Sequence, residues 1–75
     1  MALTDTDRAL LDLEQRTWTY SGAREQALLE ELGLSPTRAA QRLVWLLRDP
    51  EAWECAPTLM GRLQRRVAAG RRGVA

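Results

Sequence analysis

Cross-linking residues are scarce in this chain, and their scarcity limits what it can fold into. It has one cysteine, Cys55, and no histidine among its 75 residues. A single copy therefore cannot form an internal disulfide or a Cys/His zinc site. A domain of this size buries only about 60% of the surface that its unfolded chain exposes, so its stability is thin. We expect one domain, held together by well-packed helices or by pairing with a second chain.

Apolar residues recur at the spacing of a helix along most of the chain, and no alternating pattern of a strand is present. Capping and breaking residues predict helices over residues 5–19, 23–32, 36–48 and 51–55, and a last helix that starts at residue 57 or 58. The apolar side chains expected to pack are Leu10, Leu11, Leu13, Trp18, Tyr20, Leu28, Leu29, Leu32, Ala39, Leu43, Leu46, Leu47, Leu59, Leu63 and Val67. The sequence therefore predicts an all-α fold, a small helical bundle of four to five helices. Residues 1–69 would form the helix-turn-helix domain, and residues 70–75 a basic, flexible tail.

The turn before the third helix carries the strongest local signals. Gly33 can adopt the left-handed backbone conformation that ends a helix. Ser35 is a favoured N-cap, and Pro36 suits the first position of the next helix because its missing N–H costs nothing there. Leu32 and Leu34 flank the glycine and can pack between the two helices. Two helices joined by so short a turn have the spacing of a DNA-binding helix-turn-helix.

The third expected helix has an apolar side and a polar side. Its polar side consists of Thr37, Arg38, Gln41 and Arg48, with Arg42 on the flank. Arg38 could make a two-pronged contact to guanine, and Gln41, one turn further, could pair with adenine. Ser35 and Thr37, together with the free backbone N–H groups of the helix start, could hold a phosphate. Helix pairs with a polar front are also common in proteins that bind no DNA, so this pattern leaves both interpretations open.

Charge is distributed unevenly along the chain, although the net charge is only +1. Residues 1–35 contain seven acids and three arginines, and residues 36–75 contain three acids and eight arginines, so the halves carry about −4 and +5. In the last helix Arg62, Arg65 and Arg66 lie on one side, and Arg71 and Arg72 follow. These arginines could contact the DNA backbone, which would add affinity without sequence information. The alternatives are a solvated basic face and, more remotely, an amphipathic helix on an acidic membrane.

Trp45 projects from the polar side of the third helix. One interpretation is that the segment after Pro50, with Trp53 and Leu59, folds back and covers it. The other is that Trp45 and Trp53 belong to an interface between subunits, because buried aromatic residues anchor such interfaces. In both interpretations we expect Trp45 to be covered.

Two parts of the chain resemble known families. The segment Leu32-Gly33-Leu34-Ser35-Pro36-Thr37-Arg38-Ala39, followed by Arg42-Leu43, resembles the helix-turn-helix of sigma-factor region four and related bacterial regulators. From about Leu10 to Leu63 the chain is similar to a family of short actinobacterial and phage proteins of unknown function. The matching residues are Glu14, Trp18, Gly22, Arg24-Glu25-Gln26-Ala27, Leu34-Ser35, Thr37-Arg38 and Gln41. Ala39 and Ala40 replace an aromatic pair of that family, and Val44 replaces an asparagine. The resemblance implies DNA binding, with the departures on the helix that would read the target.

Composition excludes several classes of function. All eleven basic residues are arginine, and Lys, Asn, Ile, Phe and His are absent, a bias expected of a GC-rich genome such as that of an actinobacterium or its phages. With no His, no Lys, one Cys without a base and no glycine-rich phosphate loop, we expect no enzyme activity, no cofactor and no metal. The start of the chain lacks a secretory signal, and the apolar runs are too short to span a bilayer, so we expect a cytoplasmic protein that binds no membrane.

The sequence thus favours a DNA-binding transcriptional regulator. Its partner would be double-stranded DNA, read in the major groove by the helix that starts at Ser35. Pairing as a homodimer would add stability to so small a domain. The alternative is a small adaptor or inhibitor that binds a host protein such as an RNA polymerase or sigma subunit through Trp45, Trp53 and the arginines.

Overall fold

The computed structural model describes the backbone of residues 3–74 and the side chains of residues 3–69. It is all-α, as predicted, and no strand occurs within residues 3–74. The elements are α1 (Asp5–Gln15), α2 (Ser21–Ala27), the π-helix η1 (Leu28–Leu32), α3 (Pro36–Leu46), α4 (Pro50–Cys55) and α5 (Pro57–Val74). α2 and η1 follow each other without a break and together take the place of the expected second helix.

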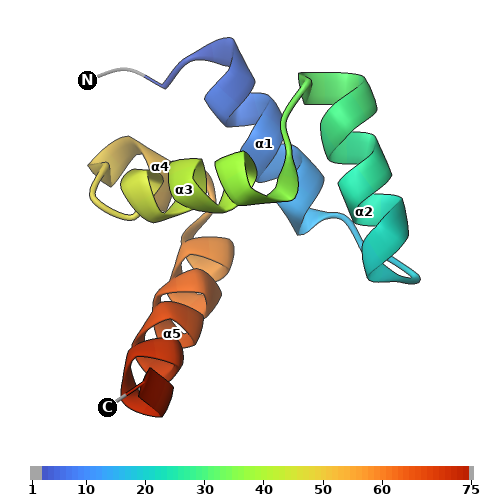
Figure 1. Cartoon of the computed structure of the whole chain (residues 1–75). Coiled ribbons are helices and arrows are strands. Elements are labelled where there is room, and N and C mark those ends of the chain that lie inside the picture. Colours follow the sequence, from blue (N-terminus) through green and yellow to red (C-terminus); the bar gives the residue numbers. More distant parts are fainter. Residues whose placement is uncertain (1–2, 75) are drawn as a thin grey trace.

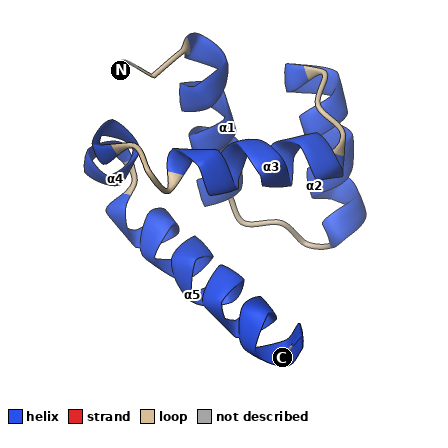
Figure 2. Cartoon of the chain, turned by 60° about the vertical axis from the view of Figure 1, so that its left-hand side comes forward, coloured by secondary structure: helices blue, strands red, loops and turns tan. Residues whose placement is uncertain are grey.

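α1 lies at the centre of the molecule. It contacts both η1 and α5, and α4 packs against α5. Figures 1 and 2 both show α3 lying across α1, while α5 extends away from the other helices toward the C-terminus. The backbone N–H of Leu3 donates to Glu51 Oε2 at 2.9 Å, which ties the start of the chain to α4. Arg24 and Glu14 form an ion pair that joins α2 to α1.

The core is made of leucines from every long helix. The largest fully buried side chains are Leu10, Leu11, Leu13, Leu28, Leu46 and Met60. Ala39, Leu43, Leu59 and Leu63 are also buried, and Trp18, Leu32, Leu34, Leu47 and Trp53 pack against them from the edge. These positions confirm the core predicted from helical spacing, except at Leu29, Tyr20 and Val67, of which Val67 is half-buried and lies outside this core.

Leu29 is 60% exposed, so the prediction that it packs was wrong. Neighbouring side chains of a helix point in clearly different directions around its axis. Leu28 is fully buried, and η1 contacts α1, so the next side chain is turned toward solvent. Spacing alone does not tell which of two adjacent leucines faces the neighbouring helix.

α1 ends at Gln15, four residues before the expected end. It begins with a capping box in which the Thr4 hydroxyl accepts from the Asp7 N–H at 3.0 Å and the Thr4 N–H donates to the Asp7 carboxylate at 3.2 Å. Arg16 is extended, and the β-branched and aromatic residues that follow are poor helix formers. Tyr20, predicted to lie in the core, is therefore outside helix phase and is 67% exposed.

The turn between η1 and α3 has the predicted structure. Gly33 adopts φ 65°, and the N–H groups of Gly33 and Leu34 donate to the carbonyls of Leu29 and Leu28 at 3.0 and 3.2 Å. These bonds satisfy carbonyls at the helix end that would otherwise lack partners. Ser35 caps α3, because its Oγ accepts from the Arg38 N–H at 3.2 Å. The three residues 33–35 thus connect two helices with local bonds only.

Replacing Gly33 and Gly61 with alanine should have opposite effects on stability. A Cβ at Gly33 meets no atom within 4 Å, but the residue has a positive φ, so alanine should lower the free energy of unfolding by about 1 kcal/mol. Gly61 lies within α5, where an added Cβ would make only an ordinary contact at 3.8 Å. Alanine at this position should therefore raise the free energy of unfolding by about 0.5–1 kcal/mol. Urea denaturation followed by circular dichroism measures both, and shifts of equal sign would contradict this account.

α4 and α5 follow the predicted order with different ends. α3 ends at Leu46 rather than residue 48, and Asp49 caps α4 by accepting from the Glu51 N–H at 2.9 Å. The basic tail was expected to begin at residue 70, but the backbone of α5 stays helical through Val74. Residue 75 of that expected tail lies outside the described residues.

Candidate nucleic-acid interface

α3 has a buried back and an exposed front. Ala39, Leu43 and Leu46 are buried against the core. The exposed side chains of the predicted reading surface are Ser35, Thr37, Arg38, Gln41 and Arg48. The predicted division of the helix into a packing side and a polar front is therefore present.

Arg42 differs from the other predicted site residues because it is engaged within the chain. Its Nε and Nη2 donate to the Asp7 carboxylate at 2.6 and 2.7 Å. Asp7 is only 2% exposed, whereas the Arg42 side chain is 39% exposed. These hydrogen bonds lower the pKa of Asp7 below its ordinary value, although burial acts in the opposite direction. They also raise the pKa of Arg42. Arg42 thus joins α3 to α1 and is not free in the way that Arg38 is.

The Asp7–Arg42 pair is the part of the site that sequence reasoning missed. No prediction related Asp7 to the site, and Arg42 was predicted only on the flank of the third helix. The two residues are 35 positions apart, so neither helical period nor cap spacing relates them. The available signal is that Asp7 precedes Leu10 and Leu11 by three and four positions, which places it on the packing side of the helix. A carboxylate buried there requires a cation or several N–H donors.

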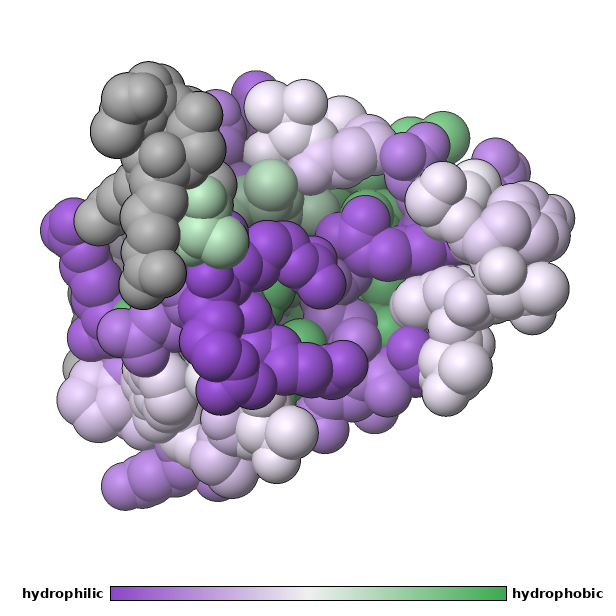
Figure 3. All heavy atoms as spheres, turned by 90° about the horizontal axis from the view of Figure 1, so that it is seen from below, coloured by the Kyte–Doolittle hydropathy of each residue, from purple (hydrophilic) through white to green (hydrophobic). Residues whose placement is uncertain are grey.

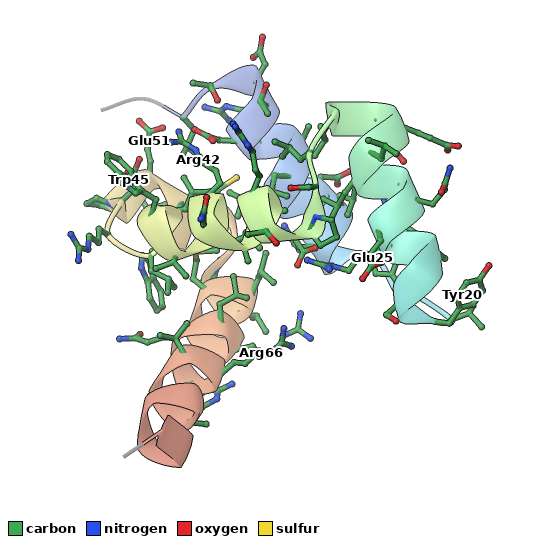
Figure 4. The ribbon with its side chains drawn as sticks, viewed as in Figure 1. Tyr20, Glu25, Arg42, Trp45, Glu51 and Arg66 are labelled. Carbon is green, nitrogen blue, oxygen red and sulfur yellow. The ribbon has the colours of Figure 1, made fainter. Side chains whose placement is uncertain are left out.

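Trp45 is not covered by the segment after Pro50, so that interpretation was wrong. It remains 60% exposed. Trp53 instead packs against the core edge, and its Nε1–H donates to the Leu47 carbonyl at 2.8 Å. This bond satisfies the indole N–H locally and holds α4 beside the end of α3. The Arg42 guanidinium lies over the Trp45 ring, 5.5 Å from its centroid. Figure 4 shows Arg42 and Trp45 on the same side of α3.

Two open hollows lie on either side of Trp45. The first, of about 330 Å³, runs between the start of α1 and the front of α3. It is lined by Thr4, Thr6, Asp7, Leu34, Arg38, Gln41, Arg42 and Trp45. The second, of similar volume, is lined by Trp45, Arg48, Asp49 and Pro50. The fold thus brings together four predicted residues, Arg38, Gln41, Arg42 and Trp45, and adds the hydroxyls of the α1 N-cap Thr4 and of Thr6 in its first turn.

The arginines of α5 are exposed but form a separate surface. Arg66 lines a smaller hollow of about 140 Å³ together with Arg24 and Glu14, and its floor is apolar. Figure 3 shows this face with green apolar atoms between purple charged side chains. In Figure 4 Arg66 lies below α3, away from Arg42 and Trp45. Arg62 and Arg65 are also exposed, while the side chains of Arg71 and Arg72 lie outside the described residues. The described structure therefore does not unite the α5 arginines with the front of α3.

The described residues were compared with the requirements of a metal site and of a membrane-spanning helix. They contain no group of three or more Cys, Asp or Glu side chains arranged to hold a metal ion. None of the described helices combines the length and the apolar character that are needed to cross a membrane. The chemistry that the site offers is instead that of hydrogen-bond donors, positive charge and one exposed aromatic ring.

Comparison with known proteins places the chain in a family. No curated protein and no solved structure matches it. Residues 2–73 match the model of a family described as Protein of unknown function (DUF3263), which confirms the predicted similarity to a family of unknown function. Because the match spans nearly the whole sequence, the chain belongs to the DUF3263 family.

Proposed function

We propose that the chain is a DNA-binding transcriptional regulator that places α3 in the major groove of double-stranded DNA. The observation that carries this proposal is the exposed front of α3. Within the described part of the chain, the side chains of Arg38 and Gln41 donate no hydrogen bond to the protein. Their donors are available, while the buried back of the same helix keeps it fixed on the core. A recognition helix needs this combination of a rigid back and unoccupied donors.

The types and spacing of these residues suit the edges of base pairs. Arg38 lies in the first turn of α3, and Gln41 follows one turn later. An arginine can donate two hydrogen bonds to guanine O6 and N7, and a glutamine can pair with adenine N6 and N7. Ser35 and Thr37 lie at the helix start, where a phosphate oxygen is favoured by the helix dipole. We assign Arg42 a supporting role, because its guanidinium is held by Asp7.

Positive charge supports contact with the DNA backbone. Arg48 is exposed next to the front of α3. Arg62, Arg65 and Arg66 are exposed on α5, on a surface separate from that front, where they would meet the DNA backbone outside the groove that α3 reads. Phosphate contacts from such residues add affinity that does not depend on sequence and that falls steeply with salt. The resemblance of the turn segment to sigma-factor region four, and of the chain to actinobacterial and phage proteins, also favours a role in transcription. A homodimer acting in the cytoplasm would read an inverted repeat.

Selection from a random pool of duplex DNA tests the proposal. We expect the protein to enrich a defined site, and its affinity to fall with a log–log salt slope of about −0.9 for each phosphate contacted. Arg38→Ala should reduce discrimination between the selected site and random duplex by about tenfold. Arg62→Ala is the matched control, because it should weaken binding to all duplexes alike and make the salt slope shallower. Failure to bind any duplex at low salt would refute the proposal.

A second candidate function rests on Trp45. Its 60% exposure leaves a large aromatic surface between two hollows, and aromatic residues are enriched at the centre of protein interfaces. A small adaptor or inhibitor could use it as the anchor for a host protein such as an RNA polymerase or sigma subunit. That function predicts that the chain forms a stable complex with the protein partner and that Trp45→Ala abolishes this complex. It also predicts that the chain selects no DNA sequence.

A further inference from the structure

Trp45 belongs to the same stripe of α3 as the proposed base-reading residues. Arg38, Gln41 and Trp45 occupy positions i, i+3 and i+7, which lie along one side of a helix. Arg38, Gln41 and Trp45 also line one hollow, so their side chains border a common space. Trp45 is 60% exposed. The stripe therefore offers a partner two polar side chains followed by one apolar ring.

The ring of Trp45 is held in place by a chain of contacts that begins in the core. Asp7 is buried and accepts two hydrogen bonds from Arg42. Arg42 in turn lies over the Trp45 ring at 5.5 Å from its centroid. A cation above an aromatic face is attracted to it, so the ring is fixed from one side and keeps the rest of its surface open. An ordered ring loses less conformational entropy on binding than a mobile one.

The surroundings of Trp45 indicate what its open surface can bind. Arg38 and Arg48 flank it with positive charge, as a polyanion requires, and Asp49 is the one carboxylate that lines the second hollow beside Arg48. In the major groove the C5-methyl of thymine is the apolar group that base edges present. α3 rises about 6 Å from Gln41 to Trp45, so the ring can reach a base pair beyond the one that Gln41 contacts. Resting on the proposed function, we propose that Trp45 is a specificity residue that packs against a thymine methyl within two base pairs of the base read by Gln41.

Replacing single thymines with deoxyuridine in the selected duplex tests this inference, because it removes only the methyl group. The wild-type protein should respond to this substitution at one thymine only, the one that faces the C-terminal end of α3. There its affinity for the duplex should fall about threefold to fivefold, as the loss of one buried methyl predicts. Trp45→Ala should weaken binding to the thymine duplex by about tenfold. The Trp45→Ala protein should bind the thymine duplex and the deoxyuridine duplex with equal affinity. Fluorescence anisotropy of labelled DNA gives each dissociation constant.

Two further variants separate the proposed contact from a general effect. Tyr20→Ala removes an aromatic side chain of similar exposure at the far end of α2, and it should retain wild-type affinity and the full thymine preference. Arg42→Lys keeps the charge but loses the two-pronged contact with Asp7. Arg42→Lys should bring the ratio of the affinities for the thymine and deoxyuridine duplexes close to one. The dependence of DNA affinity on salt concentration should stay unchanged.

The outcomes distinguish this inference from the proposed function. If no duplex binds at low salt, both fail. If duplexes bind and no thymine position responds to loss of its methyl, or if Trp45→Ala keeps the thymine preference, this inference alone fails. Unchanged DNA binding by Trp45→Ala, with loss of a protein partner, would instead assign the ring to a protein interface.

Discussion

Replacing Asp7 with asparagine is expected to lower the free energy of unfolding by about 2 kcal/mol at pH 7, because Arg42 loses its charged partner. Removing one member of a fully buried ion pair costs about 3–5 kcal/mol. The Arg42 side chain is 39% exposed and can be solvated, so we expect the smaller value. The asparagine oxygen can still accept from the Thr4 N–H, so the cap of α1 is largely kept. Urea denaturation at pH 7 measures the change.

Asp5→Asn is the matched control for this prediction. Asp5 lies in the same first turn of α1 but is exposed, so its loss removes only a favourable interaction with the helix dipole, worth about 0.3–1 kcal/mol. A double-mutant cycle with Arg42→Met isolates the pair itself. A coupling energy near zero between Asp7 and Arg42 would contradict the structural role assigned to them.

The same pair predicts how stability depends on pH. Hydrogen bonds from Arg42 lower the pKa of Asp7 in the folded state below the value of the unfolded chain. Asp7 therefore contributes its full stabilisation above the unfolded pKa of about 3.9, and loses it as the pH falls through the lower folded pKa. Wild type should lose more stability than Asp7→Asn between pH 7 and acid pH, so that their difference narrows. A difference that is constant over this range would show that the carboxylate charge is not what stabilises the fold.

Replacing Leu28 with alanine is expected to lower the free energy of unfolding by about 3 kcal/mol. Leu28 is fully buried where η1 contacts α1, and deleting its side chain leaves a cavity between the two helices. A domain this small has little stability to lose, so a large fraction of the molecules should be unfolded at 37 °C. Thermal denaturation followed by circular dichroism should show a much lower midpoint than that of the wild-type chain.

Leu29→Ala provides the control from the adjacent position. Leu29 is 60% exposed, so alanine should change the free energy of unfolding by less than about 0.5 kcal/mol. The contrast between two neighbouring leucines also tests the orientation of η1. Equal effects at both positions would mean that η1 faces α1 differently from the arrangement described.

Much of the fold could be predicted from the sequence because its signals are local. The Thr4 cap, Gly33, the Ser35 cap and Pro36 each act on backbone groups within about four residues, so they locate helix ends without knowledge of the fold. The leucine spacing of α3 likewise shows which side of the helix is buried. The polar front with Arg38 and Gln41 follows from that spacing as its opposite side.

The predictions that failed depended on which helices meet. Tyr20 and Leu29 were assigned to the core from helical period, but α1 ends before Tyr20, and η1 presents Leu28 to α1 instead of Leu29. Trp45 was expected to be covered, and α4 packs Trp53 elsewhere.

What the sequence by itself determined is thus the set of helices, the turn before α3 and the separation of its apolar and polar sides, since these arise from bonds and periods within a few residues. Only the tertiary structure decided that Arg42 is held by Asp7, that Trp45 stays exposed between two hollows, and that Arg66 lies on a different side of α3. These placements depend on how whole helices pack against one another. Packing joins residues far apart in the chain, and no local spacing records those contacts.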